Sequence, residues 1–187
     1  MKVPSRFWSR WRVRLGYPLA LVFLVLAAPT RTSLLAGGAI AALGLLIRGA
    51  AAGHLKKGQA LATFGPYAYT RNPLYLGSSF LAAGFIVAAW SPVAAALVAV
   101  YFVFFYWAVM KREEADLLAG YGKQFEEYAR RVPLFFPALR PAKSGSVASQ
   151  GFSWVQYRRN REYQALLGAC VGIVLLWLRM MLRARGY

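Results

Sequence analysis

Side chains that commonly carry enzyme chemistry are scarce in this sequence of 187 residues. The only cysteine is Cys170 and the only histidine is His54, which excludes an intrachain disulfide, a thiolate metal site and a multi-histidine metal centre. Asp and Glu together number 6, against 23 Lys and Arg. We therefore expect no bound metal, and any catalysis has to work with very few acids and bases.

Apolar residues, by contrast, are abundant. They make up 59% of the chain, where a soluble domain averages roughly 45–50%, and this excess indicates a membrane protein. A formal charge of +17 is also typical of nucleic-acid binding. The basic residues flank long apolar runs, however, so membrane topology and anionic lipid headgroups explain them more simply. We expect membrane lipids as partners and no nucleic acid.

The apolar runs and their breaks predict an all-α fold, namely a polytopic membrane helical bundle of about five transmembrane helices with a cytosolic amphipathic helix. Apolar residues within the charged segment 111–132 recur every three to four positions, as on one helical face. Gly120 and Gly122 should bend or break the helix there. The five apolar helices are expected at 15–28, 33–52, 74–90, 93–110 and 163–182, and the face of the charged segment comprises Leu117, Leu118, Tyr121, Phe125, Tyr128 and Val132.

We expect a single membrane domain over residues 1–187. Small residues within its apolar runs allow close helix approach and a homodimer. Its parts are an interfacial basic segment at 1–14, a transmembrane hairpin at 15–52, a core at 53–137, a linker at 138–153 and a C-terminal helix at 154–187.

Most of the Lys and Arg residues fall on one side of this arrangement. They lie in the N-terminal segment, between Arg48 and Arg71, and between Lys111 and Arg161. Because cytoplasmic loops carry the excess of positive charge, the sequence predicts an integral, multi-pass membrane protein whose active site faces the cytoplasm. Arg48 itself, near the end of an apolar helix, either extends to the interface or faces a polar site.

A Gly- and Pro-punctuated stretch, GPYAYTRNPLYLG at residues 65–77, separates two apolar regions. Pro73 biases Asn72 away from the α conformation. The stretch can be a helix N-terminus capped by Asn72, a kink that exposes backbone groups, or both. Arg71 offers a planar fork suited to a carboxylate, which a helix N-terminus also attracts.

Five of the six acidic residues lie between positions 113 and 127. One interpretation is pairing with nearby Lys and Arg on the helix surface. The other is that Glu113 or Glu114 accepts hydrogen bonds from a sugar diol or an ammonium group of a cofactor. Adjacent residues point about 100° apart on a helix, so the two carboxylates should have different roles. His54 is read either as a helix-end residue or as a ligand of the same site.

Taken together, Gly53-His54, the GPYAYTRNPLYLG stretch, and REEADLLAGYGKQFEEYARRVPLFFP at residues 112–137 resemble the isoprenylcysteine carboxyl methyltransferase and phospholipid methyltransferase superfamily of integral-membrane methyltransferases. The resemblance covers about residues 50–137. This chain has Asn72 where the superfamily usually has His.

The resemblance implies S-adenosylmethionine bound on the cytosolic side beneath a lid formed by the segment after Glu114. A lipid or isoprenoid-linked substrate would enter from the membrane. Arg71 and Glu114 would be catalytic. The implied cofactor-binding residues are His54, Tyr67, Arg71, Asn72, Pro73, Tyr75, Gly77, Glu113 and Glu114, and the implied substrate-binding residues are Tyr121, Phe125, Tyr128 and Arg131.

The expected reaction is methyl transfer to the polar head of a lipid or isoprenoid-linked acceptor, with carboxylate O-methylation of the isoprenylcysteine type favoured. A sulfonium is already an activated methyl donor, so such a site mainly needs positioning and exclusion of water. The alternatives are a phospholipid N-methyltransferase, an NADPH-dependent membrane reductase of the sterol-reductase type, and a lipid-binding protein without catalysis.

Overall fold

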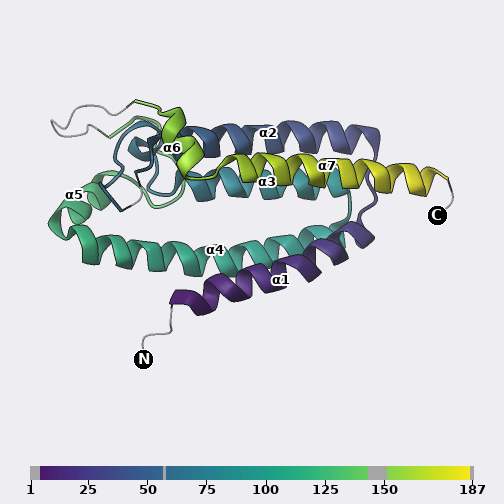
Figure 1. Cartoon of the computed structure of the whole chain (residues 1–187). Coiled ribbons are helices and arrows are strands. Elements are labelled where there is room, and N and C mark those ends of the chain that lie inside the picture. Colours follow the sequence, from purple (N-terminus) through teal and green to yellow (C-terminus); the bar gives the residue numbers. More distant parts are fainter. Residues whose placement is uncertain (1–4, 57, 143–150, 186–187) are drawn as a thin grey trace. The chain divides into compact units, whose positions relative to one another are not determined.

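The computed structural model describes residues 5–56, 58–142 and 151–185, with side chains from residue 14 onward. Within these ranges every regular element is a helix (Figure 1), which confirms the expected all-α fold. The elements are α1 (Ser5–Leu26), α2 (Arg31–His54), the 3₁₀ helix η1 (Gly65–Ala68), α3 (Pro73–Ala89), α4 (Pro92–Tyr121), α5 (Lys123–Arg131), α6 (Trp154–Arg159) and α7 (Tyr163–Ala184).

In the described part of the chain, three helices are long and apolar enough to cross a membrane, namely α2, α4 and α7. The apolar part of α1, Arg14–Leu26, and the whole of α3 are shorter apolar helices. The five predicted apolar segments are therefore all helical, as expected of a helical membrane bundle. The number of them that span stays a prediction.

The chain divides into two compact units, each assembled from separate stretches of sequence. The first unit comprises Met1–Ala41, Leu81–Val109 and Ala169–Tyr187, and the second comprises Ala42–Phe80 and Met110–Gly168. The expectation of one continuous membrane domain stays a prediction.

In the first unit, α2 and α3 approach until their backbones touch. A Cβ atom built on Gly37 would lie 2.4 Å from the carbonyl oxygen of Gly84, and one built on Gly84 would lie 2.5 Å from the backbone nitrogen of Ala41. Ser33 Oγ also donates a hydrogen bond to the carbonyl of Ala88, at 3.0 Å. Small residues at a helix contact are the usual route to close packing in a bilayer. The buried core beside this contact comprises Ala27, Ala88, Ala89 and Leu176.

In the second unit, the start of α3 packs against the end of α2. A Cβ atom on Gly77 would lie 2.6 Å from Cγ of Arg48 and 2.7 Å from the carbonyl oxygen of Gly44. Arg48 does not extend freely into solvent. Its guanidinium holds Glu162 at 2.6 and 3.0 Å and also contacts Ser78. This pairing resolves the two interpretations of Arg48 in favour of a polar site.

The predicted break after the fourth apolar segment is present. The long helix α4 ends at Tyr121, Gly122 adopts a φ of 51°, and the short helix α5 follows. Phe125, Tyr128 and Val132 form a buried cluster against which Leu117 and Tyr121 pack. The prediction was wrong for Leu118, which is 44% exposed, because it lies one residue, about 100°, away from the face that carries Leu117.

Candidate active site

The central stretch begins with a tight turn. Gly65 has a φ of 59°, and η1 follows with Pro66 at its start and Tyr67 and Ala68 buried. A Cβ atom on Gly65 would lie 2.6 Å from Nε2 of His54. Glycine is therefore required here both for the left-handed backbone and for the space that the imidazole occupies.

Backbone hydrogen bonds hold the next residues against the tail that follows α5. Arg71 N–H donates to the carbonyl of Pro133 at 2.9 Å, and the N–H groups of Ala138 and Ala142 donate to the carbonyls of Tyr69 and Ala68, both at 2.9 Å. We call this pairing of residues 68–72 with residues 133–142 the clasp. It fixes the backbone around Arg71 from both sides.

Two polar side chains reinforce the clasp. Thr70 Oγ1 donates to the carbonyl of Phe135 at 2.9 Å, and Asn72 Nδ2 donates to the carbonyl of Leu134 at 3.0 Å. Pro73 is the first residue of α3, as expected for a helix N-terminus. Asn72 therefore directly precedes that helix, and its side-chain amide binds the tail.

Arg71 and Glu114 form an ion pair that joins the start of α3 to the end of α4. Their side chains are only 16% and 17% exposed. Lys111 Nζ lies 3.4 Å from the other Glu114 oxygen. Nε of Arg71 is buried and has no hydrogen-bond partner among the described residues. A buried donor of this kind favours an acceptor group from a ligand.

Glu113 has different surroundings from its neighbour. It is exposed and lines a cavity of about 220 Å³. The loop after α2, the start of α3, and the tyrosines of α4 and α5 form the other walls. The predicted site residues in this wall are Tyr67, Arg71, Asn72, Pro73, Tyr75, Glu113, Tyr121 and Tyr128.

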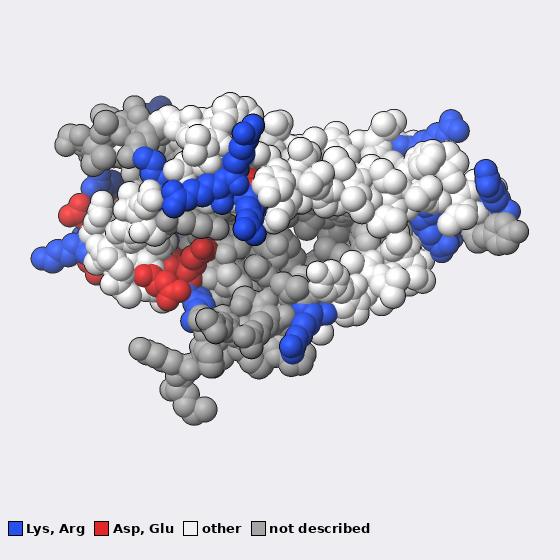
Figure 2. All heavy atoms as spheres, in the orientation of Figure 1, with Lys and Arg blue, Asp and Glu red and all other residues white. Residues whose placement is uncertain are grey.

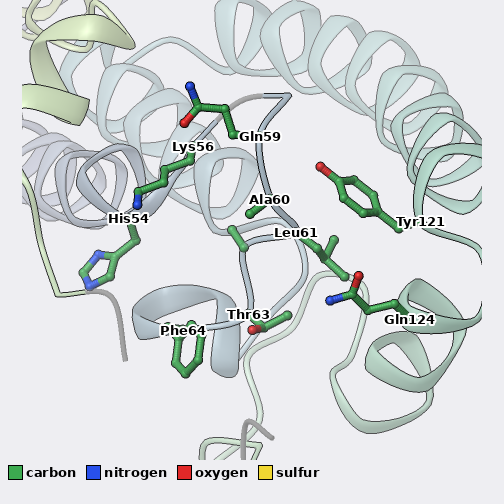
Figure 3. Close-up of a pocket in the computed structure, with 10 residues that line it drawn as sticks. His54, Lys56, Gln59, Ala60, Leu61, Thr63, Phe64, Tyr121 and Gln124 are labelled. Atoms are coloured by element: carbon green, nitrogen blue, oxygen red, sulfur yellow. The ribbon is translucent and has the colours of Figure 1, made fainter. Parts of the chain in front are cut away.

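A second cavity, of about 230 Å³, adjoins the first. The lining residues that the two share are Lys56, Ala60, Leu61, Ala62 and Tyr121. Figure 3 shows Tyr121 and Gln124 across this cavity from the loop of Gln59–Leu61, with His54 and Lys56 on the other side. Together the two cavities reach the size of small-molecule pockets, roughly 300–1,000 Å³.

Two buried tyrosines, Tyr67 and Tyr128, form part of the wall of the first cavity. Tyr128 Oη donates to the carbonyl of Tyr67 at 2.7 Å. Burial raises the pKa of both hydroxyls far above the ordinary value of a tyrosine. The neighbouring Tyr128 phenol and the Glu113 carboxylate raise the pKa of Tyr67 further, and the Arg71 cation partly offsets the rise in the pKa of Tyr128. Both phenols therefore stay neutral and serve as hydrogen-bonding and packing groups.

Five predicted site residues do not line the first cavity, although one of them, Glu114, pairs with Arg71 in its wall. His54 lines the second one, with Nδ1 2.8 Å from the carbonyl oxygen of Ala50. Gly77 packs against α2, Phe125 is 4% exposed within the buried cluster, and Arg131 pairs with Glu127 at 3.4 Å on the surface. Their predicted roles in binding stay predictions.

The sequence analysis missed the loop of residues 59–63, whose Ala60, Leu61 and Ala62 line both cavities. It also missed Lys56, which lines both cavities, and Gln124, which lines the second. The only available signal was position, because this loop connects the end of α2 to the turn at Gly65. Among the described residues, no group of three or more His, Cys, Asp or Glu side chains is arranged to hold a metal ion.

Comparison with known proteins matches residues 32–124, about half of the chain, to the family model described as phospholipid methyltransferase. Over that segment the chain belongs to the phospholipid methyltransferase family. The family lies within the superfamily that the sequence resembles, and its chemistry is methyl transfer. The matched segment contains the loop of residues 59–63, the start of α3 and both carboxylates of the site.

Two curated relatives also match this methyltransferase-family chain. The nickel-cobalt-cadmium resistance protein NccN of Alcaligenes xylosoxydans xylosoxydans is 37% identical over 91 residues, 49% of this chain and 42% of the relative. The cobalt-zinc-cadmium resistance protein CzcN of Cupriavidus metallidurans is 37% identical over 84 residues, 45% of this chain and 38% of the relative. The matches thus span about two-fifths of each relative. No solved structure matches the chain.

Proposed function

We propose that this protein is an integral-membrane methyltransferase that uses S-adenosylmethionine and methylates the polar head of a lipid or isoprenoid-linked acceptor. The observation that carries the proposal is that Arg71 and Glu113 line one cavity, with Glu114 paired to Arg71, within a segment of the methyltransferase family.

The described residues fit such a cofactor. The orphaned Nε–H of Arg71, at the start of α3, suits the carboxylate of the methionine moiety. Glu113, exposed in the cavity wall, suits the ribose diol or the ammonium group. Glu114 holds the Arg71 guanidinium in place. Bound S-adenosylmethionine would supply a methyl group already activated by the sulfonium.

The chain's own residues would then mainly orient the reactants and exclude water, which is worth several kcal/mol when alignment is good. Tyr67, Tyr121 and Tyr128 place aromatic rings in the cavity wall, and aromatic faces attract a cation. A carboxylate acceptor needs no general base, so O-methylation of the isoprenylcysteine type suits a site with so few acids and bases. The family model favours a phospholipid amine as the alternative acceptor.

Calorimetry of the full chain in lipid nanodiscs tests cofactor binding with S-adenosylhomocysteine. We expect saturable binding that falls at least tenfold in Glu113→Ala. The matched control is Asp116→Ala, which removes an exposed carboxylate that pairs with Arg112 on the same helix, at 3.9 Å. This variant should bind S-adenosylhomocysteine normally. Absence of binding to the folded wild-type protein, or a gain in heat stability with NADPH alone, would overturn the proposal.

The acceptor class is tested by mass spectrometry of lipids after incubation with a deuterated methyl donor. A methyl ester on a prenylated cysteine supports the favoured reaction, and a methylated ethanolamine headgroup supports the alternative. Labelled cofactor that binds but transfers nothing to either class would contradict a lipid-type acceptor.

A further inference from the structure

A third cavity, of about 360 Å³, lies in the second unit and shares no lining residue with the two cavities of the candidate active site. Leu46 and Gly49 of α2, Trp154 and Tyr157 of α6, and Leu166 of α7 form most of its wall. The wall is almost entirely apolar, so the cavity suits a hydrocarbon chain.

Three aromatic side chains form one part of the wall of this cavity. Phe152 and Trp154 stack edge to face with centroids 4.9 Å apart, and Trp154 and Tyr157 do so at 5.6 Å. Trp154 is 68% exposed and the neighbouring Val155 is 71% exposed. Exposed tryptophan beside exposed aliphatic surface is typical of the membrane–water interface.

Exposed basic residues come directly after these aromatic residues in the sequence. Arg158, Arg159 and Arg161 lie at the end of α6 and in the turn to α7, and no ion pair joins them to a carboxylate of the described residues. Figure 2 shows Lys and Arg side chains gathered over the position that Figure 1 gives to α6 and the start of α7.

The turn that carries these arginines is held in place. Asn160 Nδ2 donates to the carbonyls of Ala52 and Leu55, both at 2.8 Å, which ties the turn to the end of α2. The single carboxylate in the cavity wall is Glu162, and Arg48 neutralises it at 2.6 and 3.0 Å. The cavity is therefore apolar inside, and three exposed arginines lie within four residues of Tyr157 in its wall.

We propose that this cavity binds one acyl chain of an anionic phospholipid, whose phosphate rests on Arg158, Arg159 and Arg161. The inference is independent of methyl transfer, since it concerns a lipid held at a site separate from the cavities of the candidate active site. The chemistry that recognises the ligand is a phosphodiester without a compensating ammonium, attached to a hydrocarbon chain.

Tryptophan quenching in nanodiscs tests the proposal, because brominated acyl chains quench a nearby indole. The full chain is placed in discs that contain either brominated phosphatidylglycerol or brominated phosphatidylcholine at equal mole fraction. Subtracting the signal of Trp154→Phe isolates Trp154 from the other tryptophans. We expect phosphatidylglycerol to quench Trp154 at least twofold more than phosphatidylcholine does.

Three variants locate the effect. The triple variant Arg158→Gln, Arg159→Gln and Arg161→Gln should abolish the preference, whereas the charge-matched Lys123→Gln, Arg130→Gln and Arg140→Gln should keep it. Gly49→Leu places a side chain in the cavity and should lower quenching by both lipids about twofold. Circular dichroism and thermal unfolding of each variant serve as the folding check.

Equal quenching of wild-type Trp154 by the two lipids would overturn the proposal. Equal loss of the preference in both triple variants would also overturn it, because the attraction would then come from the overall positive charge rather than from this site.

Discussion

Glu113 and Glu114 are neighbours in the chain, but their side chains have different surroundings. Glu114 is mostly buried and binds Arg71 and Lys111, whereas Glu113 is exposed in the cavity wall. The angle of about 100° between successive helical residues accounts for the difference. Glu114 therefore maintains the geometry of the site, and Glu113 is available to a ligand.

Replacing each glutamate by glutamine should have a different effect on stability and on cofactor binding. Glu114→Gln removes the charge that balances a mostly buried arginine, so we expect a loss of about 1–3 kcal/mol in the free energy of unfolding, below the cost of a fully buried pair. Glu113→Gln should leave stability nearly unchanged and weaken S-adenosylhomocysteine binding at least tenfold. Thermal unfolding and calorimetry of both variants check this, and equal stability losses would contradict it.

Tyr67 and Tyr128 give the protein a predictable response to alkaline pH. Burial raises the pKa of both hydroxyls, whereas in the unfolded chain they ionise near pH 10. Above about pH 10 the unfolded state therefore binds fewer protons than the folded state, and stability falls as the pH rises.

Tyr128→Phe tests this response. The variant loses the hydrogen bond to the Tyr67 carbonyl, which costs about 1 kcal/mol at neutral pH. Above pH 10 its stability should fall less steeply than that of the wild type, since one group fewer contributes. Denaturant unfolding between pH 8 and pH 11 measures both effects, and parallel curves for the two proteins would show that Tyr128 does not contribute.

At the scale of the elements, the contact between α2 and α3 in the first unit depends on which glycine faces the partner helix. Gly37 touches the backbone of α3, whereas a Cβ atom on the adjacent Gly38 would meet nothing within 4 Å. The pair offers a matched comparison between two identical substitutions on one helix.

Gly37→Val should separate the two helices and destabilise the protein by about 1–3 kcal/mol or more, as overpacking does. Gly38→Val should change stability by only a few tenths of a kcal/mol. Steric-trap or detergent unfolding in mixed micelles measures the difference. A similar loss in both variants would mean that helix propensity, rather than contact, decides the effect.

Much of the helical layout follows from the sequence, because apolar length and Gly or Pro breaks mark each end. Pro73, Gly122 and the apolar runs place α3, α4 and α5 within a few residues. The ion pair of Arg48 with Glu162 was not predicted, since the two residues are 114 positions apart and nothing local links them. The clasp was not predicted either, because backbone hydrogen bonds have no residue-type signature.

At the scale of the whole molecule, charge and hydropathy together define the orientation that we propose for a membrane protein. All six carboxylates fall in the second unit, and those visible in Figure 2 lie where Figure 1 labels α5, α6 and the adjoining end of α4. Basic residues dominate the same stretches. Because cytoplasmic loops carry the excess of positive charge, we propose that the candidate site faces the cytoplasm.

Cysteine labelling in intact cells tests that orientation. In a Cys170→Ser background, Lys123→Cys on α5 should be protected from an impermeant maleimide until the membrane is permeabilised. Thr32→Cys, exposed at the start of α2, should react from outside. The reverse pattern would place the candidate site outside the cytoplasm, and labelling of both positions from the same side would contradict the multi-pass arrangement.

The clasp has a consequence for how a bound cofactor would be detected. Main-chain amides on the tail report on the Arg71 segment about seventy positions earlier, since Ala138 and Ala142 donate directly to the carbonyls of Tyr69 and Ala68. A ligand that immobilises Arg71 should therefore slow deuterium uptake in residues 138–142, even though it touches none of them. Because main-chain groups alone make these bonds, side chains along the tail can drift in evolution while this remote readout persists.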